Sequence, residues 1–162
     1  MAEKKQVSTR LLETVKKLLT DYLEEHQHRK TPERFAILEE IYTRTGHFDV
    51  EALFMYLKET NYRVSRATLY NTMDLLLDAK LIVKHQFGKN IAQFERVYGN
   101  KQHDHLICVE CGEVSEIDSE VADIVKEVAE RTEFTVSHHS LYIYGVCKKC
   151  KSRKVGNLEN NI

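Results

Sequence analysis

Apolar residues recur at helical spacing along the first half of the chain. From Ser8 to about Gln27 they fall on one helical face, and the charged residues lie off that face. Thr31-Pro32-Glu33 is a typical helix start, with threonine as the N-cap and proline at the first helical position. Asp49 and Ser65 are further N-cap candidates, each followed by apolar residues at helical spacing. The pattern therefore predicts four helices before residue 80.

Two strand-like segments follow these helices. Leu81–Phe87 and Ile91–Val97 are rich in apolar residues and flank Gly88-Lys89-Asn90, which is a hairpin turn signal. Helices followed by a β-hairpin are the outline of a winged helix-turn-helix. In that arrangement the last helix before the hairpin lies in the major groove of DNA.

The character of the chain changes at Tyr98-Gly99-Asn100-Lys101. The segments His105–Val109 and Glu113–Ile117 are predicted as strands, Ser119 as the cap of a helix, and Phe134–Tyr144 as an apolar strand. This second unit is too small to bury much core alone, so we expect a copy of itself or a staple to stabilise it.

The predicted fold class is α+β, with an N-terminal winged helix-turn-helix domain and a small C-terminal α/β dimerisation domain. We place the first domain at residues 1–97, a hinge at 98–101, the second domain at 102–151 and a flexible polar tail at 152–162.

Composition narrows the class of protein. The 162 residues include 24 Lys and Arg against 25 Asp and Glu, a net charge of −1, and 42% of the chain is apolar. These values exclude a disordered chain. There is no run approaching the ~20 apolar residues of a membrane span and no visible secretion signal, so we expect a cytoplasmic protein without a membrane partner. Charge distribution matters more than the sum, so nucleic-acid binding stays open.

All the cysteines form two Cys-x-x-Cys pairs in the second unit: Cys108 with Cys111, and Cys147 with Cys150. Two such pairs can supply four thiolates to one structural zinc ion. The alternatives are two disulfides or a redox pair. Disulfides are disfavoured without a secretion signal, and a redox motif uses a single pair before a helix.

A second candidate metal site has harder ligands. On an extended strand, His103 and His105 point to one side and Asp104 to the other. Further candidate ligands are His47, Glu95, Glu116, Asp123, His138 and His139. Imidazoles with carboxylates and no sulfur suit Fe²⁺, Mn²⁺, Co²⁺ or Zn²⁺. The alternative is that these are ordinary polar residues at the surface.

Taken together, several motifs resemble the ferric uptake regulator family of metal-dependent bacterial transcription repressors. The resemblance spans roughly residues 10–150, and its motifs are Thr31-Pro32-Glu33-Arg34, Ser65-Arg66-Ala67-Thr68-Leu69-Tyr70, His103-Asp104-His105-Leu106-Ile107-Cys108 with Cys111-Gly112, and His139-Ser140-Leu141-Tyr142. It implies a homodimer that binds a double-stranded DNA operator. It also implies a structural Zn²⁺ and a regulatory Fe²⁺, Mn²⁺ or Zn²⁺.

The resemblance also implies site residues. Carried over by position, the regulatory metal site comprises His47, Glu95, His103, His105 and Glu116. A further metal site would comprise Asp104, Asp123 and His139. The chain departs from the family pattern here, because Gln102 stands where many members have histidine and Asp123 where glutamate is common.

The candidate DNA-binding residues are Arg29, Lys30, Arg34, Arg66, Thr68, Tyr70 and Asn71. Many relatives have arginine where this chain has Asn71. Arginine reads guanine and asparagine reads adenine, so Asn71 could shift the sequence preference. Asn71 could equally contact phosphate or face solvent.

These observations favour a DNA-binding repressor that senses iron. Zinc-, manganese- and peroxide-responsive regulators of the same family are the near alternatives. From another class, His103, Asp104 and His105 could serve a metallohydrolase. The chain lacks a nucleophile motif, a phosphate loop and a His-Glu-x-x-His motif, so we expect no enzyme activity. A third reading is a zinc-stapled protein-interaction module.

Overall fold

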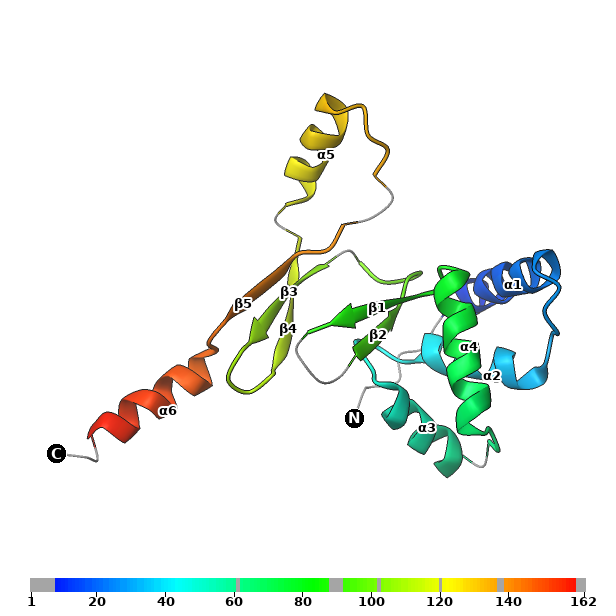
Figure 1. The fold of residues 1–162 in the computed structure, drawn as a ribbon, viewed down its shortest axis with the longest axis horizontal. Coiled ribbons are helices and arrows are strands. Elements are labelled where there is room, and N and C mark those ends of the chain that lie inside the picture. The colour runs from blue at the N-terminus through cyan, green and yellow to red at the C-terminus, as the bar shows by residue number, and fades with distance from the viewer. Residues whose placement is uncertain are drawn as a thin grey trace. The chain divides into compact units, whose positions relative to one another are not determined.

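The computed structural model describes residues 8–60, 62–87, 92–101, 103–119, 121–136 and 139–159, with side chains to Arg153 (Figure 1). The chain forms two compact units that meet between Asn100 and Lys101, and Phe87 belongs to the second. We call them the helical unit and the sheet unit.

Four helices build the helical unit, as the sequence predicts: α1 (Thr9–Glu25), α2 (Pro32–Thr43), α3 (Val50–Glu59) and α4 (Arg66–Asp78). Two predicted caps form. The Asp49 carboxylate accepts a hydrogen bond from the Ala52 N–H at 2.7 Å, and the Ser65 hydroxyl accepts one from the Thr68 N–H at 3.0 Å. Thr31 occupies the N-cap of α2 without a side-chain hydrogen bond.

One apolar core joins these helices to the hairpin. Its fully buried side chains come from all four helices and from the start of β1, and include Leu19, Leu23, Ile37, Leu38, Tyr42, Leu53, Leu69, Leu76 and Leu81. The Tyr42 hydroxyl donates to the Leu81 carbonyl at 2.7 Å, which fixes α2 to the hairpin. Burial raises the pKa of Tyr42 well above its usual range, so its hydroxyl stays protonated as a donor.

The predicted hairpin consists of β1 (Ile82–Gln86) and β2 (Ala92–Arg96), paired antiparallel. Its turn, Gly88-Lys89-Asn90, lies outside the described residues. An isolated bridge between Phe48 and Phe94 adds the loop before α3 to β2, through N–H···O bonds of 2.9 and 2.8 Å. This bridge determines where the neighbouring residue His47 lies.

The sheet unit contains three strands in the order β4-β3-β5: β3 (His103–Cys108), β4 (Val114–Asp118) and β5 (Tyr142–Gly145). β3 is central, antiparallel to β4 and parallel to β5. Helix α5 (Ala122–Arg131) stands off this sheet in Figure 1, and none of its residues is buried. Helix α6 (Lys148–Glu159) follows β5.

The sheet unit differs from the sequence-based expectation in three places. The strand expected over Phe134–Tyr144 is the shorter β5, because only residues beside β3 find a hydrogen-bonding partner strand. Val121, not Ser119, is the N-cap of α5, and the Ser119 hydroxyl lies 3.3 Å from His139 Nε2 instead. Residues 152–159, expected as part of a flexible tail, continue α6, although Gly156 and Asn157 are weak helix formers.

The boundary between the two units follows Asn100, inside the segment 98–101 that the sequence analysis assigns to a hinge. Gly99 belongs to the helical unit and has φ +80°, and a Cβ there would lie 2.5 Å from Leu11 Cδ2. A side chain would therefore be both strained and obstructed. Among the described residues, no helix is long and apolar enough to span a membrane.

Candidate metal centres and nucleic-acid interface

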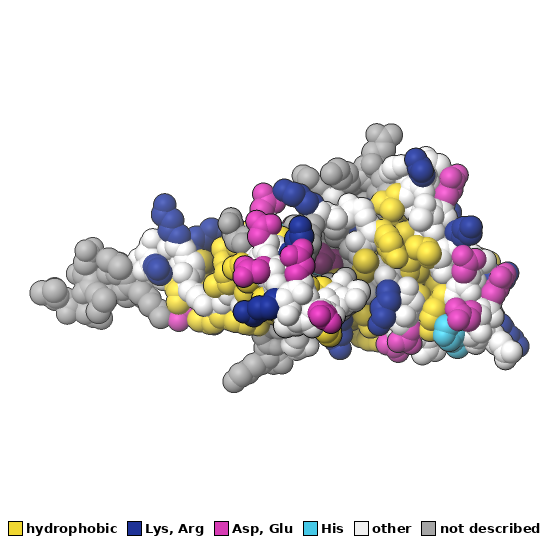
Figure 2. All heavy atoms as spheres, turned by 90° about the horizontal axis from the view of Figure 1, so that it is seen from above, with side chains coloured by type: hydrophobic (Ala, Val, Ile, Leu, Met, Phe, Trp, Pro, Cys, Tyr) yellow, Lys and Arg dark blue, Asp and Glu magenta, His cyan; other side chains and the backbone are white. Residues whose placement is uncertain are grey.

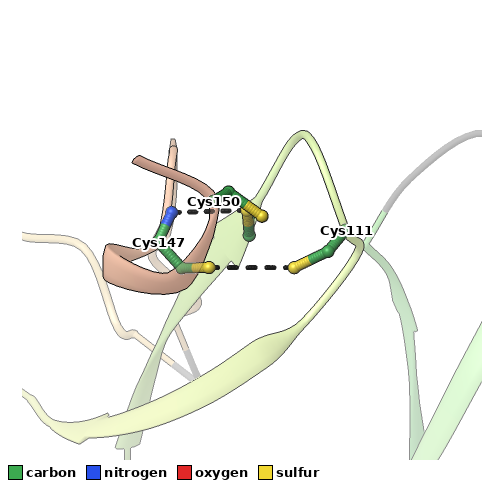
Figure 3. Close-up of side chains that lie close together, drawn as sticks. Cys111, Cys147 and Cys150 are labelled. Atoms are coloured by element: carbon green, nitrogen blue, oxygen red, sulfur yellow. Dashed lines mark hydrogen bonds between the residues drawn. The ribbon is translucent and has the colours of Figure 1, made fainter. Parts of the chain in front are cut away.

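The four cysteines converge in the sheet unit (Figure 3). Cys108 ends β3 and Cys111 lies in the turn to β4, whereas Cys147 and Cys150 lie at the start of α6. Gly112, with φ +73°, follows the first pair, and glycine adopts this left-handed conformation without strain. All four sulfurs lie within 4.8 Å of one another.

This geometry fits zinc, and none of the four cysteines forms a disulfide. Cys111 Sγ and Cys147 Sγ are 3.8 Å apart, far beyond the ~2.05 Å of an S–S bond. Four sulfurs held ~2.3 Å from a tetrahedral zinc ion are about 3.8 Å apart. The Cys₄ cluster therefore fits a structural zinc site.

The electrostatics of the cluster also favour a cation. The Cys147 N–H donates to Cys108 Sγ at 3.3 Å, and this contact leads the backbone hydrogen bonds that lower the pKa of Cys108 to about 6. The neighbouring thiols, first Cys147 and then Cys111, raise the pKa of Cys150 to about 12. One thiolate thus forms readily and opposes the next, so full ionisation needs a divalent ion.

In the helical unit, the structure brings two predicted regulatory ligands together. His47 Nε2 lies 3.6 Å from Glu95 Oε2, and both side chains are about nine-tenths buried. A third residue that the sequence analysis missed, His85, places Nε2 3.0 Å from Glu95 Oε1. Ligand atoms of all three residues lie within 4.8 Å of one another.

In the sheet unit, the other three predicted regulatory ligands lie on neighbouring strands. His103 and His105 are on β3, with ring centroids 4.8 Å apart. Glu116 on β4 pairs in register with His105, and its Oε1 lies 4.0 Å from His103 Nε2. The alternation predicted for this strand holds, because these two imidazoles share one face. Phe87 packs on His105, with ring centroids 4.8 Å apart.

Asp104 is buried on the other face of β3. Its exposed fraction is 1%, and neither carboxylate oxygen has a hydrogen-bond partner among the described residues. A buried carboxylate without compensation is costly, so this environment suits a bound cation.

The structure does not assemble the predicted site around Asp104. Asp123 is exposed on α5, and His139 is near Ser119. Among the described residues, no cluster of potential ligands contains Asp104, Asp123 and His139 together. Gln102 lies outside the described residues.

The predicted DNA-reading residues lie on α4. Arg66, Tyr70 and Asn71 are exposed, and Thr68 is half-buried beside the Ser65 cap. Arg66 forms an ion pair with Glu51 of α3, and the Tyr70 hydroxyl donates to the same carboxylate at 3.2 Å. The first turns of α4 thus present a guanidinium and a phenol, held by one acidic residue.

The candidate DNA-binding residues Arg29, Lys30 and Arg34 lie near the start of α2. Arg29 and Lys30 are exposed, and Arg34 donates to the Arg29 carbonyl. Lys30 is paired with Glu24 at 2.5 Å. Basic and acidic side chains are interspersed on the face drawn in Figure 2. A near-neutral surface of this kind leaves the placement of individual basic residues, not net charge, to determine any affinity for phosphate.

Comparison with known proteins gives the context of these sites. Residues 25–144 match the model of the ferric uptake regulator family. The ferric uptake regulation protein of Bacillus subtilis is 30% identical over 136 residues, which cover 82% of this chain and 91% of that protein. The peroxide-responsive repressor PerR of Staphylococcus epidermidis is 31% identical over 124 residues, covering 76% and 81% respectively.

A solved structure agrees with these matches. The ferric uptake regulator from Pseudomonas aeruginosa with manganese superposes with a TM-score of 0.69 at 29% identity, covering 80% of this chain and 97% of that one. Members of the matched family are metal-responsive transcriptional regulators that bind DNA and form dimers, not enzymes, so the metallohydrolase interpretation is not retained. With its winged-helix unit, Cys₄ cluster and imidazole–carboxylate pairs, this chain belongs to the ferric uptake regulator family.

Proposed function

We propose that the protein is an iron-sensing repressor that binds a pseudo-palindromic operator as a homodimer when its regulatory metal site is filled. The observation that carries this proposal is the donor chemistry of two pairs, the buried His47–Glu95 pair and the more exposed His103–Glu116 pair. These pairs offer nitrogen and oxygen and no sulfur, a donor set that suits Fe²⁺ or Mn²⁺. The manganese in the Pseudomonas aeruginosa relative supports this chemistry.

The regulatory ligands divide between the two units. We infer that His47 and Glu95 of the helical unit and His103, His105 and Glu116 of the sheet unit hold the same ion. The ion would supply positive charge to both sets of donors. Because both units would bind the same ion, the angle between the units would be restrained. A cation that binds the restrained state more tightly shifts the population toward it.

The homodimer is supported by apolar side chains exposed on α5. Ile124 is 59% exposed and Val128 42% exposed, and both lie on one face of this helix. A second subunit that covers this face of α5 would bury both side chains. Two subunits would then present two copies of α4, spaced by about one DNA turn of ~34 Å.

DNA recognition is assigned to α4 and the start of α2. Arg66, Thr68, Tyr70 and Asn71 would face base edges, because a recognition helix reads DNA with its N-terminal turns. The side chains of Arg29, Lys30 and Arg34 would contact phosphates and fix the register. The exposure of Arg66, Tyr70 and Asn71 supports this assignment.

We also propose a further metal site at Asp104, with fewer protein ligands than the regulatory site. Its buried carboxylate, without a hydrogen-bond partner among the described residues, would supply one ligand, and Asp123 and His139, which do not cluster with it in this structure, would have to approach to supply the others. Water would complete the shell.

A gel-shift titration tests the proposal. Anaerobic protein with its zinc retained is titrated against a pseudo-palindromic duplex with Fe²⁺, Mn²⁺, Zn²⁺ or a chelator. We expect Fe²⁺ and Mn²⁺ to tighten binding at least ~10-fold and affinity to fall steeply with salt. Equal binding in the chelator would refute metal sensing. Stronger activation by Zn²⁺ alone would identify a zinc sensor.

The resemblance to a peroxide-responsive repressor sets the second candidate function. Peroxide sensors of the family have aspartates in the regulatory site, whereas this chain has Glu95 and Glu116. We therefore expect the Mn²⁺-loaded and Fe²⁺-loaded proteins to keep DNA binding after brief treatment with dilute hydrogen peroxide. Loss of binding in the Fe²⁺ form alone would favour the peroxide-responsive function.

A further inference from the structure

We propose that His85 is a metal ligand, and that His47, His85 and Glu95 form a divalent-cation site contained within the helical unit. We call these residues the imidazole–carboxylate cluster. The inference rests on the proposed regulatory centre, because His47 and Glu95 belong to both. It adds a ligand and a binding step that need no residue of the sheet unit.

Backbone pairing positions all three residues before any ion arrives. On the β1–β2 ladder, His85 is opposite Gln93, so Glu95 is its diagonal neighbour. Residues two apart on adjacent strands share a face and reach each other across the pair. The Phe48–Phe94 bridge places His47 beside the same end of β2.

The separations of the ligand atoms match a coordination shell. Atoms bound ~2.1 Å from a metal are about 3.0 Å apart at right angles and about 3.4 Å apart at the tetrahedral angle. His85 Nε2 to Glu95 Oε1 is 3.0 Å, and His47 Nε2 to Glu95 Oε2 is 3.6 Å. The two imidazoles meet edge to face, with centroids 5.3 Å apart. Small side-chain rotations would suffice to bind one ion.

Burial of the imidazole–carboxylate cluster favours the binding of a cation. His85 is 3% exposed and Glu95 is 8% exposed. A divalent cation between the two imidazoles would add positive charge beside this buried carboxylate.

A chain of hydrogen bonds also holds the Glu95 carboxylate in place. The Asn100 side-chain amide donates to Glu95 Oε2 at 3.4 Å, and Arg96 Nε donates to Asn100 Oδ1 at 2.8 Å. Arg96 in turn donates to the Tyr42 carbonyl at 2.7 Å. Metal ligands are commonly oriented by such outer hydrogen bonds, so Asn100 keeps Glu95 facing the imidazoles.

Two imidazole nitrogens and one carboxylate form a donor set for Fe²⁺, Mn²⁺, Co²⁺ or Zn²⁺ that leaves coordination positions open. The helical unit can therefore capture a cation first. Ligands of the sheet unit would fill open positions afterwards and raise the affinity.

Cobalt binding to the full chain tests this inference, because Co²⁺ absorbs visible light according to its ligands. The Cys₄ zinc is kept in place and Co²⁺ is titrated into the wild type, His85→Ala and His28→Ala, where His28 is an exposed histidine of the same unit. We expect His85→Ala to weaken Co²⁺ binding ~10- to 100-fold and to shift the absorption spectrum. His28→Ala should match the wild type.

A second background isolates the helical unit within the intact chain. The triple variant His103→Ala/Asp104→Asn/His105→Ala removes candidate ligands of β3, and it should still bind one Co²⁺ weakly. Adding His85→Ala should abolish that binding. If circular dichroism shows that the triple variant is unfolded, Co²⁺ binding by the wild type is compared with binding by His85→Ala and His85→Gln, and that comparison tests whether His85 is a ligand.

The possible failures are distinct. Unchanged Co²⁺ affinity and spectrum in His85→Ala would overturn the assignment of His85 and leave metal-dependent repression intact. A different result is that Co²⁺ binding requires His85 but metal does not change the affinity for DNA. That result would support this site and refute the proposed function.

Discussion

The buried carboxylate of Asp104 shows how a single residue can indicate that a protein binds a cation. Buried carboxylates in folded proteins are nearly always hydrogen-bonded or paired, yet neither oxygen of Asp104 has such a partner among the described residues. Its neighbours His103 and His105 lie on the other face of the same strand. Asp104 therefore carries a cost in the metal-free protein that a cation would remove.

Asp104→Asn should stabilise the metal-free protein and weaken metal binding. Removing the uncompensated charge is expected to raise the free energy of unfolding by at least ~1 kcal/mol when only the Cys₄ zinc is retained. Urea denaturation with and without added Mn²⁺ measures both effects. A metal-free variant less stable than the wild type would contradict this account.

Cys108→Ser should remove zinc and unfold the sheet unit. The remaining three thiols cannot complete a tetrahedral site, and binding of structural zinc is coupled to folding by ~10 kcal/mol or more. Elemental analysis should show zinc near zero, while circular dichroism keeps much of the signal of α1 to α4. Ser115→Ala, an exposed position on β4, is the matched control. Retained zinc would exclude Cys108 as a ligand.

The sequence predicted the convergence of the four cysteines, and it named His47 and Glu95, which the structure brings together, but not His85 beside them. Two short Cys-x-x-Cys spacings constrain four sulfurs locally, and the structure brings them together. His85 was missed because a lone histidine on a strand has no spacing motif. A hairpin centred on Lys89 would have placed His85 diagonal to Glu95, so register was the signal that could have revealed it.

Helices α3 and α4 are linked at their exposed ends by Glu51. This carboxylate pairs with Arg66 and accepts from Tyr70, the two residues assigned to base edges. Arg66 also lies over the Phe54 ring, 4.5 Å from its centroid. Glu51 thereby occupies the groups that DNA would use, and its charge repels phosphate.

Glu51→Gln should tighten DNA binding about 2- to 5-fold, because an exposed ion pair contributes about 0.2–1 kcal/mol and the variant frees Arg66. Fluorescence anisotropy at fixed salt measures the change. Glu59→Gln, on the same helix, should have no effect. Weaker binding by Glu51→Gln would show instead that Glu51 positions Arg66 and Tyr70 productively.

At the scale of elements, prediction succeeded where periodicity and caps agree. All four helices of the helical unit and the strands of its hairpin were expected, because their apolar faces have one core to cover. It failed at β5 and α6. An apolar segment such as Phe134–Tyr144 has strand propensity along its length, but only tertiary pairing decides which residues become strand.

On the scale of the whole molecule, α5 is a helix of which no residue is buried in the single chain. Ile124→Asp should shift the protein from dimer to monomer, because a charge would have to be buried in an apolar contact. Analytical ultracentrifugation measures the dissociation constant, which we expect to rise at least ~100-fold. Lys126→Glu, exposed on the same helix, is the control. An intact dimer in Ile124→Asp would place the interface elsewhere.

The bridge between Phe48 and Phe94 has a mechanical consequence. His47 precedes Phe48, Asp49 begins α3, and Glu51 stands only four residues beyond His47. A movement of His47 on binding a metal would therefore shift the residues that lead into α3, and with them the Glu51 carboxylate that contacts Arg66 and Tyr70. The residues proposed to bind the metal and the residue that contacts the proposed DNA-reading side chains are thus close together in the sequence.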